Sequence, residues 1–246
     1  MNWATIGIDA SELGGTWPTS KILQPYRGRV IEVHPEDQDN APRLYLECGS
    51  AEALESALKL LQQFLSALAY HWDLPIPVIM QLGGSSRLGV GRGRKAPPYR
   101  PPHHPQSSLG FVPETSDPRA LLALALYREA LNQDSYPFKF LSFYKIVNIL
   151  HEKGPAQIDW INAATAKTSG QGEYQRLQQL RSQRKDAGRY LYESGRCAVA
   201  HAFAQPLVDP DDPADTLRLG VDCSLMKAVA RYAIRYELGV SCGVGL

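Results

Sequence analysis

The sequence predicts an α+β protein with a small N-terminal α+β domain at residues 1–82 and a C-terminal all-helical bundle at residues 117–246. Short runs rich in β-branched and aromatic residues, bounded by turn formers, predict strands in the first part. Leucines at helical spacing over residues 51–70 predict a helix that packs against them. From residue 117 onward, long apolar stretches follow a strong helix start, and a basic stretch rich in Gly and Pro at residues 83–116 separates the two parts.

The composition is that of an ordinary globular protein. Of the 246 residues, 44% are hydrophobic and 21% are charged, and the formal net charge is +1. These values exclude a disordered chain, a collagen and a uniformly basic nucleic-acid binder. The N-terminus lacks the basic region and apolar run of a signal peptide, and no apolar stretch reaches the roughly 18 residues that span a bilayer. We therefore expect a cytoplasmic protein without a membrane partner.

The four cysteines, at positions 48, 197, 223 and 242, show no CxxC spacing. They indicate neither a disulfide framework nor a zinc site, and they fit a reducing compartment. We therefore expect no bound metal and no cofactor.

The near-zero net charge conceals an asymmetry along the chain. Residues 1–82 carry 5 basic and 10 acidic side chains, residues 83–118 carry 5 and 2, and residues 119–246 carry 16 and 13. An acidic N-terminal part with a net charge of −5 therefore offsets a basic remainder of +6. Contacts with nucleic acid are expected in that remainder.

The N-terminal part is expected to contain strands at Trp3–Ile8, Arg29–His34 and Arg43–Glu47, a helix at Ala51–Tyr70 and a further strand at Ile76–Leu82. The helix is amphipathic because its apolar residues recur at three- and four-residue steps: Leu54, Leu58, Leu61, Leu65 and Leu68. No catalytic arrangement is visible here. We interpret this part as a docking or scaffolding domain that could bind a protein partner.

The stretch 85–112 contains no acidic residue and is dense in glycine and proline, which interrupt helices and strands. We expect a long loop or linker that either contacts RNA phosphates or is a solvated tether. Its basic residues are Arg87, Arg92, Arg94, Lys95 and Arg100. The glycines at positions 89, 91 and 93 resemble a phosphate loop, but KAPPYRPP follows shortly after. No helix can start there, which excludes a dinucleotide or P-loop site.

The C-terminal bundle is expected to begin at Asp117 and Pro118, an N-cap followed by proline at the first helical position. Leu121–Leu131 is apolar nearly all round and is expected to be the central helix. Phe138–His151 presents a broad apolar face, and Ser224–Leu238 closes the chain as a helix. The inward residues of that last helix are expected to be Leu225, Val229, Tyr232 and Tyr236.

A basic helix is expected over Gln171–Tyr192, which is poor in aliphatic residues and so should lie partly exposed on the bundle. Its basic residues are Arg176, Arg181, Arg184, Lys185 and Arg189. Arg184, Lys185 and Arg189 are the candidates for contacts with an RNA backbone, and a solvated basic face is the alternative.

Arg196 and His201 lie in the segment that follows. Ser194-Gly195 is expected to interrupt the preceding helix, with Ser194 as the cap of a new one. Five residues at about 100° each place the two side chains about 140° apart on an ideal helix. Only the long reach of Arg196, or an irregular turn, could bring both side-chain heads into one cleft.

An R-x4-H segment on a late helix of an apolar bundle, preceded by a basic helix, resembles the HEPN superfamily (higher eukaryote and prokaryote nucleotide-binding domains). The segments LALALYREALNQDSYPFKFLSFYKIVNIL, GRCAVAHA and VDPDDPADTLRL are similar to one branch, the Apea-like HEPN proteins and the methylamine-utilisation (MauJ-like) accessory proteins. The resemblance covers roughly residues 117–240. It implies a helical bundle that is usually dimeric. Many members are metal-independent endoribonucleases, and others only bind partners or nucleotides.

The resemblance implies Arg196 and His201 as the motif pair. His201 would accept the proton of a ribose 2′-hydroxyl, and Arg196 would hold the scissile phosphate. A homodimer would supply the second acid that the leaving oxygen needs. Active members commonly place Asn or Asp directly after the arginine, where this chain has Cys197, a poor hydrogen-bonding residue. Two hypotheses remain: an RNA-binding protein that acts as an endoribonuclease, and a non-catalytic accessory protein linked to methylamine utilisation.

Overall fold

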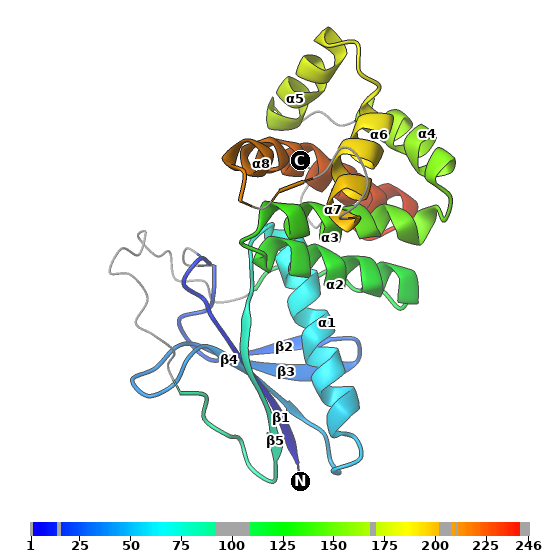
Figure 1. Cartoon of the computed structure of the whole chain (residues 1–246). Coiled ribbons are helices and arrows are strands. Elements are labelled where there is room, and N and C mark those ends of the chain that lie inside the picture. Colours follow the sequence, from blue (N-terminus) through cyan, green and yellow to red (C-terminus); the bar gives the residue numbers. More distant parts are fainter. Residues whose placement is uncertain are drawn as a thin grey trace. The chain divides into compact units, whose positions relative to one another are not determined.

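A computed structural model describes residues 2–13, 16–91, 109–167, 171–201, 208–209 and 211–241. The chain divides into two compact units, Met1–Glu114 and Thr115–Ser241, here called the sheet unit and the helical unit (Figure 1). The sheet unit holds all the strands that the described residues form, and the described elements of the helical unit are helices. The α+β fold class expected from the sequence is therefore confirmed.

The sheet unit contains one antiparallel sheet in the order β2-β3-β4-β1-β5 (Figure 1). Its strands are β1 (Trp3–Ile8), β2 (Ile22–Tyr26), β3 (Arg29–His34), β4 (Arg43–Glu47) and β5 (Val78–Gly84). Strands β1, β3 and β4 have the predicted bounds, because β-branched and aromatic residues fill them and turn formers end them. Strand β5 begins slightly later than the predicted Ile76.

Strand β2 is not predicted by the sequence, because Pro25 lies inside it and proline cannot donate a ladder hydrogen bond. The structure resolves this conflict by placing β2 at the edge of the sheet, where it pairs with β3 alone. Arg27 and Gly28, with φ angles of 48° and 73°, form the two-residue turn between these strands. Positive φ at both central residues is typical of the tight turns that suit the twist of a hairpin.

Helix α1 (Leu54–Trp72) packs on one face of the sheet, against β1 and β4 (Figure 1). Ile6 and Leu44 contribute to the buried face of the sheet, and Phe64 and Leu65 belong to the buried stripe of the helix. Removing these apolar side chains from water stabilises the layer by about 1.5–3 kcal/mol for each large residue. The predicted helix is confirmed.

The described part of the predicted basic loop is attached to the sheet unit. Val90 is buried and so close to Gly7 that a Cβ there would lie 2.2 Å from a Val90 methyl carbon. Arg87 stacks 3.9 Å over the ring of Trp3 and forms an ion pair with Glu32 at 2.5 Å. The other basic residues of the loop lie outside the described residues: Arg92, Arg94, Lys95 and Arg100.

The described residues of the helical unit form α2 (Pro118–Asn132), α3 (Tyr136–Leu150), α4 (Gly154–Thr165), α5 (Gln171–Ser182), α6 (Ala187–Tyr190), the π-helix η1 (Leu191–Cys197), α7 (Ala198–Ala200), α8 (Pro213–Tyr232) and the π-helix η2 (Ala233–Glu237) (Figure 1). Asp117 caps α2 as predicted, since its side chain accepts a hydrogen bond from the Arg119 amide at 2.8 Å. Among the described residues, no helix is both long and apolar enough to cross a bilayer.

The central helix of this unit is α3, so the prediction that Leu121–Leu131 is central was wrong. Helix α3 packs against α2, α8 and both π-helices, and Phe140, Phe143 and Tyr144 are buried in its core face. Helix α2 packs against α3 and η2 and leaves Leu122 52% exposed. An apolar composition therefore does not by itself mean that a helix is buried on every side.

Three other helices differ from the prediction. Helix α4 is absent from the prediction, because its sequence GPAQIDWINAAT carries only a thin apolar stripe. The predicted basic helix is split into α5 and α6, with Arg184 in a left-handed conformation at the break. Helix α8 begins at Pro213, well before the predicted Ser224, because Asp212 caps it by accepting from the Ala214 amide at 2.8 Å. Tyr236, predicted to face inward, is 61% exposed.

Gly188 permits the close approach of α6 to α4, and we predict that Gly188→Ala destabilises the protein. A Cβ at this position would lie 2.2 Å from the carbonyl oxygen of Ile158, and the Gly188 amide donates to Asn162 at 2.8 Å. Displacing backbone in a packed region costs about 1–3 kcal/mol. Urea denaturation measures this cost. Gly91→Ala is the control, because nothing lies within 4 Å of its added carbon; equal stability of the two variants would contradict the prediction.

Candidate functional site

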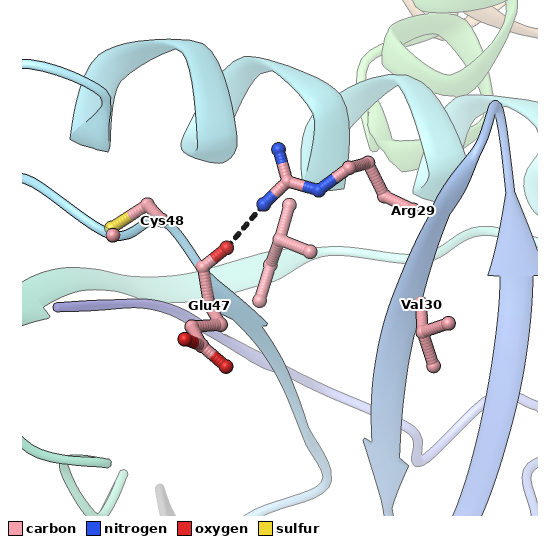
Figure 2. A pocket seen from close by; sticks show the side chains of 6 residues that line it. Arg29, Val30, Glu47 and Cys48 are labelled. Carbon is pink, nitrogen blue, oxygen red and sulfur yellow. Dashed lines mark hydrogen bonds between the residues drawn. The ribbon is translucent and has the colours of Figure 1, made fainter. Parts of the chain in front are cut away.

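The sheet unit has a shallow hollow of about 430 Å³ beside the ends of β3 and β4 (Figure 2). It is lined by Arg29, Val30, Leu46, Glu47, Cys48 and Gly49. Figure 2 shows the Arg29 guanidinium reaching the backbone carbonyl of Glu47, to which it donates a hydrogen bond. Arg29 thereby links β3 to the end of β4. None of the predicted site residues lines this hollow. The predicted residues all belong to the helical unit.

Arg196 lies in the π-helix η1, which continues directly from α6 through Ser194 and Gly195. The prediction that Ser194 caps a new helix was therefore wrong: the backbone does not break there but changes its hydrogen-bond period from four residues to five. Gly195 is buried, and an added Cβ would lie 2.3 Å from the ring of Phe140 in α3. The glycine lets the π-helix lie directly on the central helix.

The structure brings the heads of Arg196 and His201 together. Nη1 of Arg196 lies 3.4 Å from Nε2 of His201. Two departures from ideal helix geometry make this approach possible. Arg196 belongs to a widened π turn, and His201, which ends α7, has an extended backbone with φ −130° and ψ 110°. The 140° separation expected for an ideal helix therefore does not apply.

Three neighbours hold the Arg196 guanidinium. Its Cζ lies 5.7 Å from the centre of the Tyr192 ring, which is within the range of a cation–π contact. Its Nη1 also lies 3.6 Å from Sγ of Cys197 and 3.4 Å from His201. The thiol is a weak acceptor. Cys197 therefore contacts the guanidinium of Arg196 only weakly, and the Tyr192 ring and the His201 imidazole also orient it.

The contact between Arg196 and His201 indicates which nitrogen of the imidazole carries its proton. A guanidinium has only N–H donors, so a hydrogen bond to Nε2 requires a lone pair there. In this arrangement the proton of a neutral His201 lies on Nδ1. Nε2 is then the atom that could accept a proton from a bound molecule, once such a molecule separates it from Arg196.

Tyr144 and Gln157 form the buried floor next to this pair. The Tyr144 ring lies 6.5 Å from that of Tyr192, and its hydroxyl donates to Oε1 of Gln157 at 3.0 Å. Burial raises the pKa of Tyr144, with a further increase from Tyr192 and an opposing effect of Arg196. The phenol therefore stays neutral and holds the floor in place rather than exchanging protons.

Helix α8, which packs against the π-helix η1, carries the centre of a buried ionic network. This centre is Asp222, whose side chain is 1% exposed. Nε and Nη2 of Arg176 each lie 2.7 Å from its Oδ1, and the Tyr190 hydroxyl donates to Oδ2 at 3.0 Å. Arg218 approaches Oδ2 at 3.7 Å. Burial raises the pKa of Asp222, and Arg176 opposes that rise. The network joins α5, α6 and α8.

Arg218 extends this network to the π-helix. Its Nη1 donates to the carbonyl oxygen of Ser194 at 2.8 Å, and its Nη2 pairs with Asp215 at 3.2 Å. The carbonyl of Ser194 lies within η1, two residues before Arg196. Asp222 thereby helps to position the backbone that carries the candidate site.

The predicted RNA-contacting residues are exposed, but two of them have partners. Lys185 lies 5.0 Å from the ring centre of Tyr190, and Arg189 forms a surface ion pair with Glu193 at 3.2 Å. Arg184 is exposed in the break between α5 and α6. Arg176, which the sequence groups with the same basic face, is instead buried in the network, so its assignment to a basic surface was wrong.

Sequence reasoning missed the residues that support the pair: Tyr144, Gln157, Tyr192, Arg218 and Asp222. The sequence contained a signal for Asp222, because it is a lone carboxylate between apolar residues of a helix, and such a group needs a buried partner. The sequence contained no signal for the other four residues, because their roles come from contacts between distant elements. Among the described residues, no group of three or more His, Cys, Asp or Glu side chains gathers as a metal site would require.

The fold and the site together define a two-unit α+β protein whose helical unit carries an Arg–His pair on a π-helix. Residues 123–235, within that unit, match the family model described as methylamine utilization protein MauJ. The resemblance to the MauJ-like branch is therefore confirmed over these residues. No curated protein and no solved structure matches the chain.

We predict that Asp222→Asn strongly destabilises the protein. The substitution leaves two arginines in the network without their common negative partner, and breaking a buried pair in this way costs about 3–5 kcal/mol. The control is Glu193→Gln, which breaks the exposed pair with Arg189 and should cost less than about 1 kcal/mol. Chemical denaturation followed by far-UV circular dichroism measures both. Similar losses in the two variants would contradict a structural role for the network.

The third stability prediction concerns Asp186, the N-cap of α6. It accepts from the Arg189 amide at 2.7 Å and from the Asn162 side chain at 2.8 and 3.0 Å. Desolvation alone would raise its pKa, but these hydrogen bonds prevail and lower it. The stabilisation is therefore present at neutral pH and is lost as the pH falls from about 4 through the depressed pKa.

Asp186→Ala should accordingly cost about 1 kcal/mol at pH 7. The difference between wild type and variant should shrink as acid protonates the wild-type carboxylate. Urea titrations of both proteins over a pH series test this, and a difference that stays constant down to the lowest pH would refute the electrostatic part of the argument.

Proposed function

We propose that the helical unit is a HEPN-like domain that binds RNA at Arg196 and His201 and cleaves it without a metal. The observation that supports this proposal is the 3.4 Å approach of the guanidinium to the imidazole Nε2. A permanently charged guanidinium next to an imidazole is a suitable pair for a phosphodiester with an adjacent hydroxyl. The reaction requires RNA because DNA lacks the 2′-hydroxyl.

The proposed reaction gives each residue one role. A phosphate placed between the two heads receives hydrogen bonds from Arg196, and Nε2 of His201 then accepts the 2′-hydroxyl proton. The 2′-oxygen bonds to phosphorus, the bond to the 5′-oxygen breaks, and Arg196 stabilises the charge that builds on the phosphate. The leaving 5′-oxygen needs a proton from a second acid. A homodimer would supply it through the His201 of a second copy.

The exposed basic residues before η1 would guide the RNA backbone toward the pair. Arg184, Lys185 and Arg189 all precede η1 in the chain and are exposed. Lys185 contacts Tyr190, which belongs to the Asp222 network that supports η1. Phosphate contacts of this kind add affinity without sequence preference.

A non-catalytic accessory role is the second candidate. The match of residues 123–235 to the MauJ family supports a link to methylamine utilisation. The weak thiol acceptor at Cys197 also favours a pair that binds rather than reacts. In this role the helical unit would serve as a dimerisation surface, and the sheet unit would bind a protein partner.

Incubation of the purified protein with mixed RNA in EDTA distinguishes the two candidates. We expect cleavage by the wild type and at least a hundredfold loss in Arg196→Gln and His201→Ala, since general base catalysis alone contributes about 10²–10⁴ in rate. Lys145→Gln, which changes an exposed charge on α3, is the control and should retain full activity.

Two outcomes would overturn the nuclease proposal. One is the absence of cleavage at micromolar protein, and the other is equal cleavage by the wild type and both site variants. RNA binding that Arg196→Gln weakens, without any cleavage, would leave a binding function and support the accessory role.

A further inference from the structure

Four aromatic side chains of the helical unit lie in a row that the site described above does not include. The rings of His151 and Trp160 are 5.5 Å apart, those of Trp160 and Tyr232 are 6.2 Å apart, and those of Tyr232 and Tyr236 are 4.7 Å apart. They come from the end of α3, from α4, from the end of α8 and from η2. We call these four residues the aromatic track.

The aromatic track is at the surface and carries positive charge. Tyr236 is 61% exposed, and the other three rings are half-buried. The Lys167 ammonium lies 5.7 Å from the ring centre of Tyr232, and the Arg235 guanidinium lies 5.2 Å from that of Tyr236. Plain core packing does not explain a row of rings that remains partly exposed and is lined by cations.

Glu237 holds the middle of the aromatic track in position. Its Oε1 accepts a hydrogen bond from Nε1 of Trp160 at 3.3 Å. This bond satisfies the indole N–H and fixes the plane of the ring between His151 and Tyr232. The Glu237 carboxylate is thus bonded to the edge of the Trp160 ring. Lys167 and Arg235 lie near the rings of Tyr232 and Tyr236, where they can attract an anionic group.

A chain of contacts connects the aromatic track to the Arg196 site. Gln157, one helical turn before Trp160, donates from Nε2 to the His151 carbonyl at 2.7 Å and accepts from the Tyr144 hydroxyl at 3.0 Å. Tyr144 in turn contacts Tyr192, the ring beneath Arg196. The first turn of α4 also touches this ring, since a Cβ on Gly154 would lie 2.6 Å from the Tyr192 hydroxyl.

We propose that the aromatic track binds a single-stranded segment of RNA that leads to Arg196. A base stacks against Tyr236, the exposed ring, its neighbours contact the accessible edges of the half-buried rings, and the phosphates face Lys167 and Arg235. Proteins that bind single-stranded nucleic acid commonly combine aromatic rings with neighbouring cations, because every base has a face that can stack on a ring. A duplex cannot use the aromatic track, since its bases are already stacked and paired. This inference rests on the proposed RNA function and adds the form of the substrate.

The test measures binding separately from cleavage. Fluorescence anisotropy of the full-length protein is recorded with a labelled 2′-O-methyl oligouridine of about 12 nucleotides, which lies within the range that single-strand sites cover. This probe keeps its bases and phosphates but has no free 2′-hydroxyl for the reaction to use. The same sequence paired with its complement is the duplex probe.

The variants separate stacking from charge. Tyr236→Ala removes one exposed ring and should raise the Kd for the single strand about tenfold, whereas Tyr236→Phe keeps the ring and should bind as the wild type does. Arg235→Gln should reduce the slope of log affinity against log salt by about 0.7, as expected for one lost phosphate contact on a single strand. Phe138→Ala, which removes a ring that is 59% exposed outside the aromatic track, is the control and should change nothing.

The outcomes distinguish this inference from the proposed function. If the wild type binds the single strand and Arg196→Gln weakens binding, while Tyr236→Ala and Arg235→Gln bind as the wild type does, the aromatic track is overturned and the RNA function stands. Equal affinity for the duplex also overturns the aromatic track. If the wild type binds neither probe, both proposals fail. Equal thermal unfolding of all variants shows that altered folding does not produce the differences.

Discussion

The carboxylate of Asp222 cannot stay inside the helical unit without partners, and this requirement arranges the helices around it. A buried charge is tolerated only when paired and hydrogen-bonded. The partners are Arg176 from α5, Tyr190 from α6 and Arg218 from α8 itself. Because Arg218 also donates to a carbonyl of η1, the network fixes the π-helix as well. The location of the Arg196 site therefore depends on an ionic interaction that does not itself belong to the site.

The π-helix gives the R-x4-H spacing a geometry that an α-helix does not provide. On a regular helix the two residues would point in different directions, whereas a widened turn before an extended His201 lets the heads meet at 3.4 Å. π-Helical turns are rare and occur frequently at functional sites. Gly195 makes this turn compatible with the packed interior, because it lets the π-helix rest on Phe140.

Sequence reasoning succeeded where local pattern and tertiary environment agree. Strands β1, β3 and β4 and helix α1 were predictable, because alternation and helical spacing match the faces they bury. Sequence reasoning failed where the position of an element in the fold decides which residues it can contain and which of them are buried. Pro25 is acceptable in a strand only because β2 is at an edge, and Leu122 stays exposed on the apolar helix α2 although α3 and η2 pack against that helix. The basic residue Arg176 became a buried ion-pair partner for the same kind of reason.

The sequence by itself determined the α+β class and most of the local elements and, through its resemblance to a family, proposed Arg196 and His201 as a candidate pair. Only the tertiary structure decided whether the two side chains meet, which residues hold them and which aromatic rings form the aromatic track. The physical reason is the range of the interactions. Helical and strand periodicities act over a few residues, whereas the pairing of Arg176 with Asp222, or of Trp160 with Tyr232, joins residues far apart in the chain. Such contacts exist only after the helices have packed.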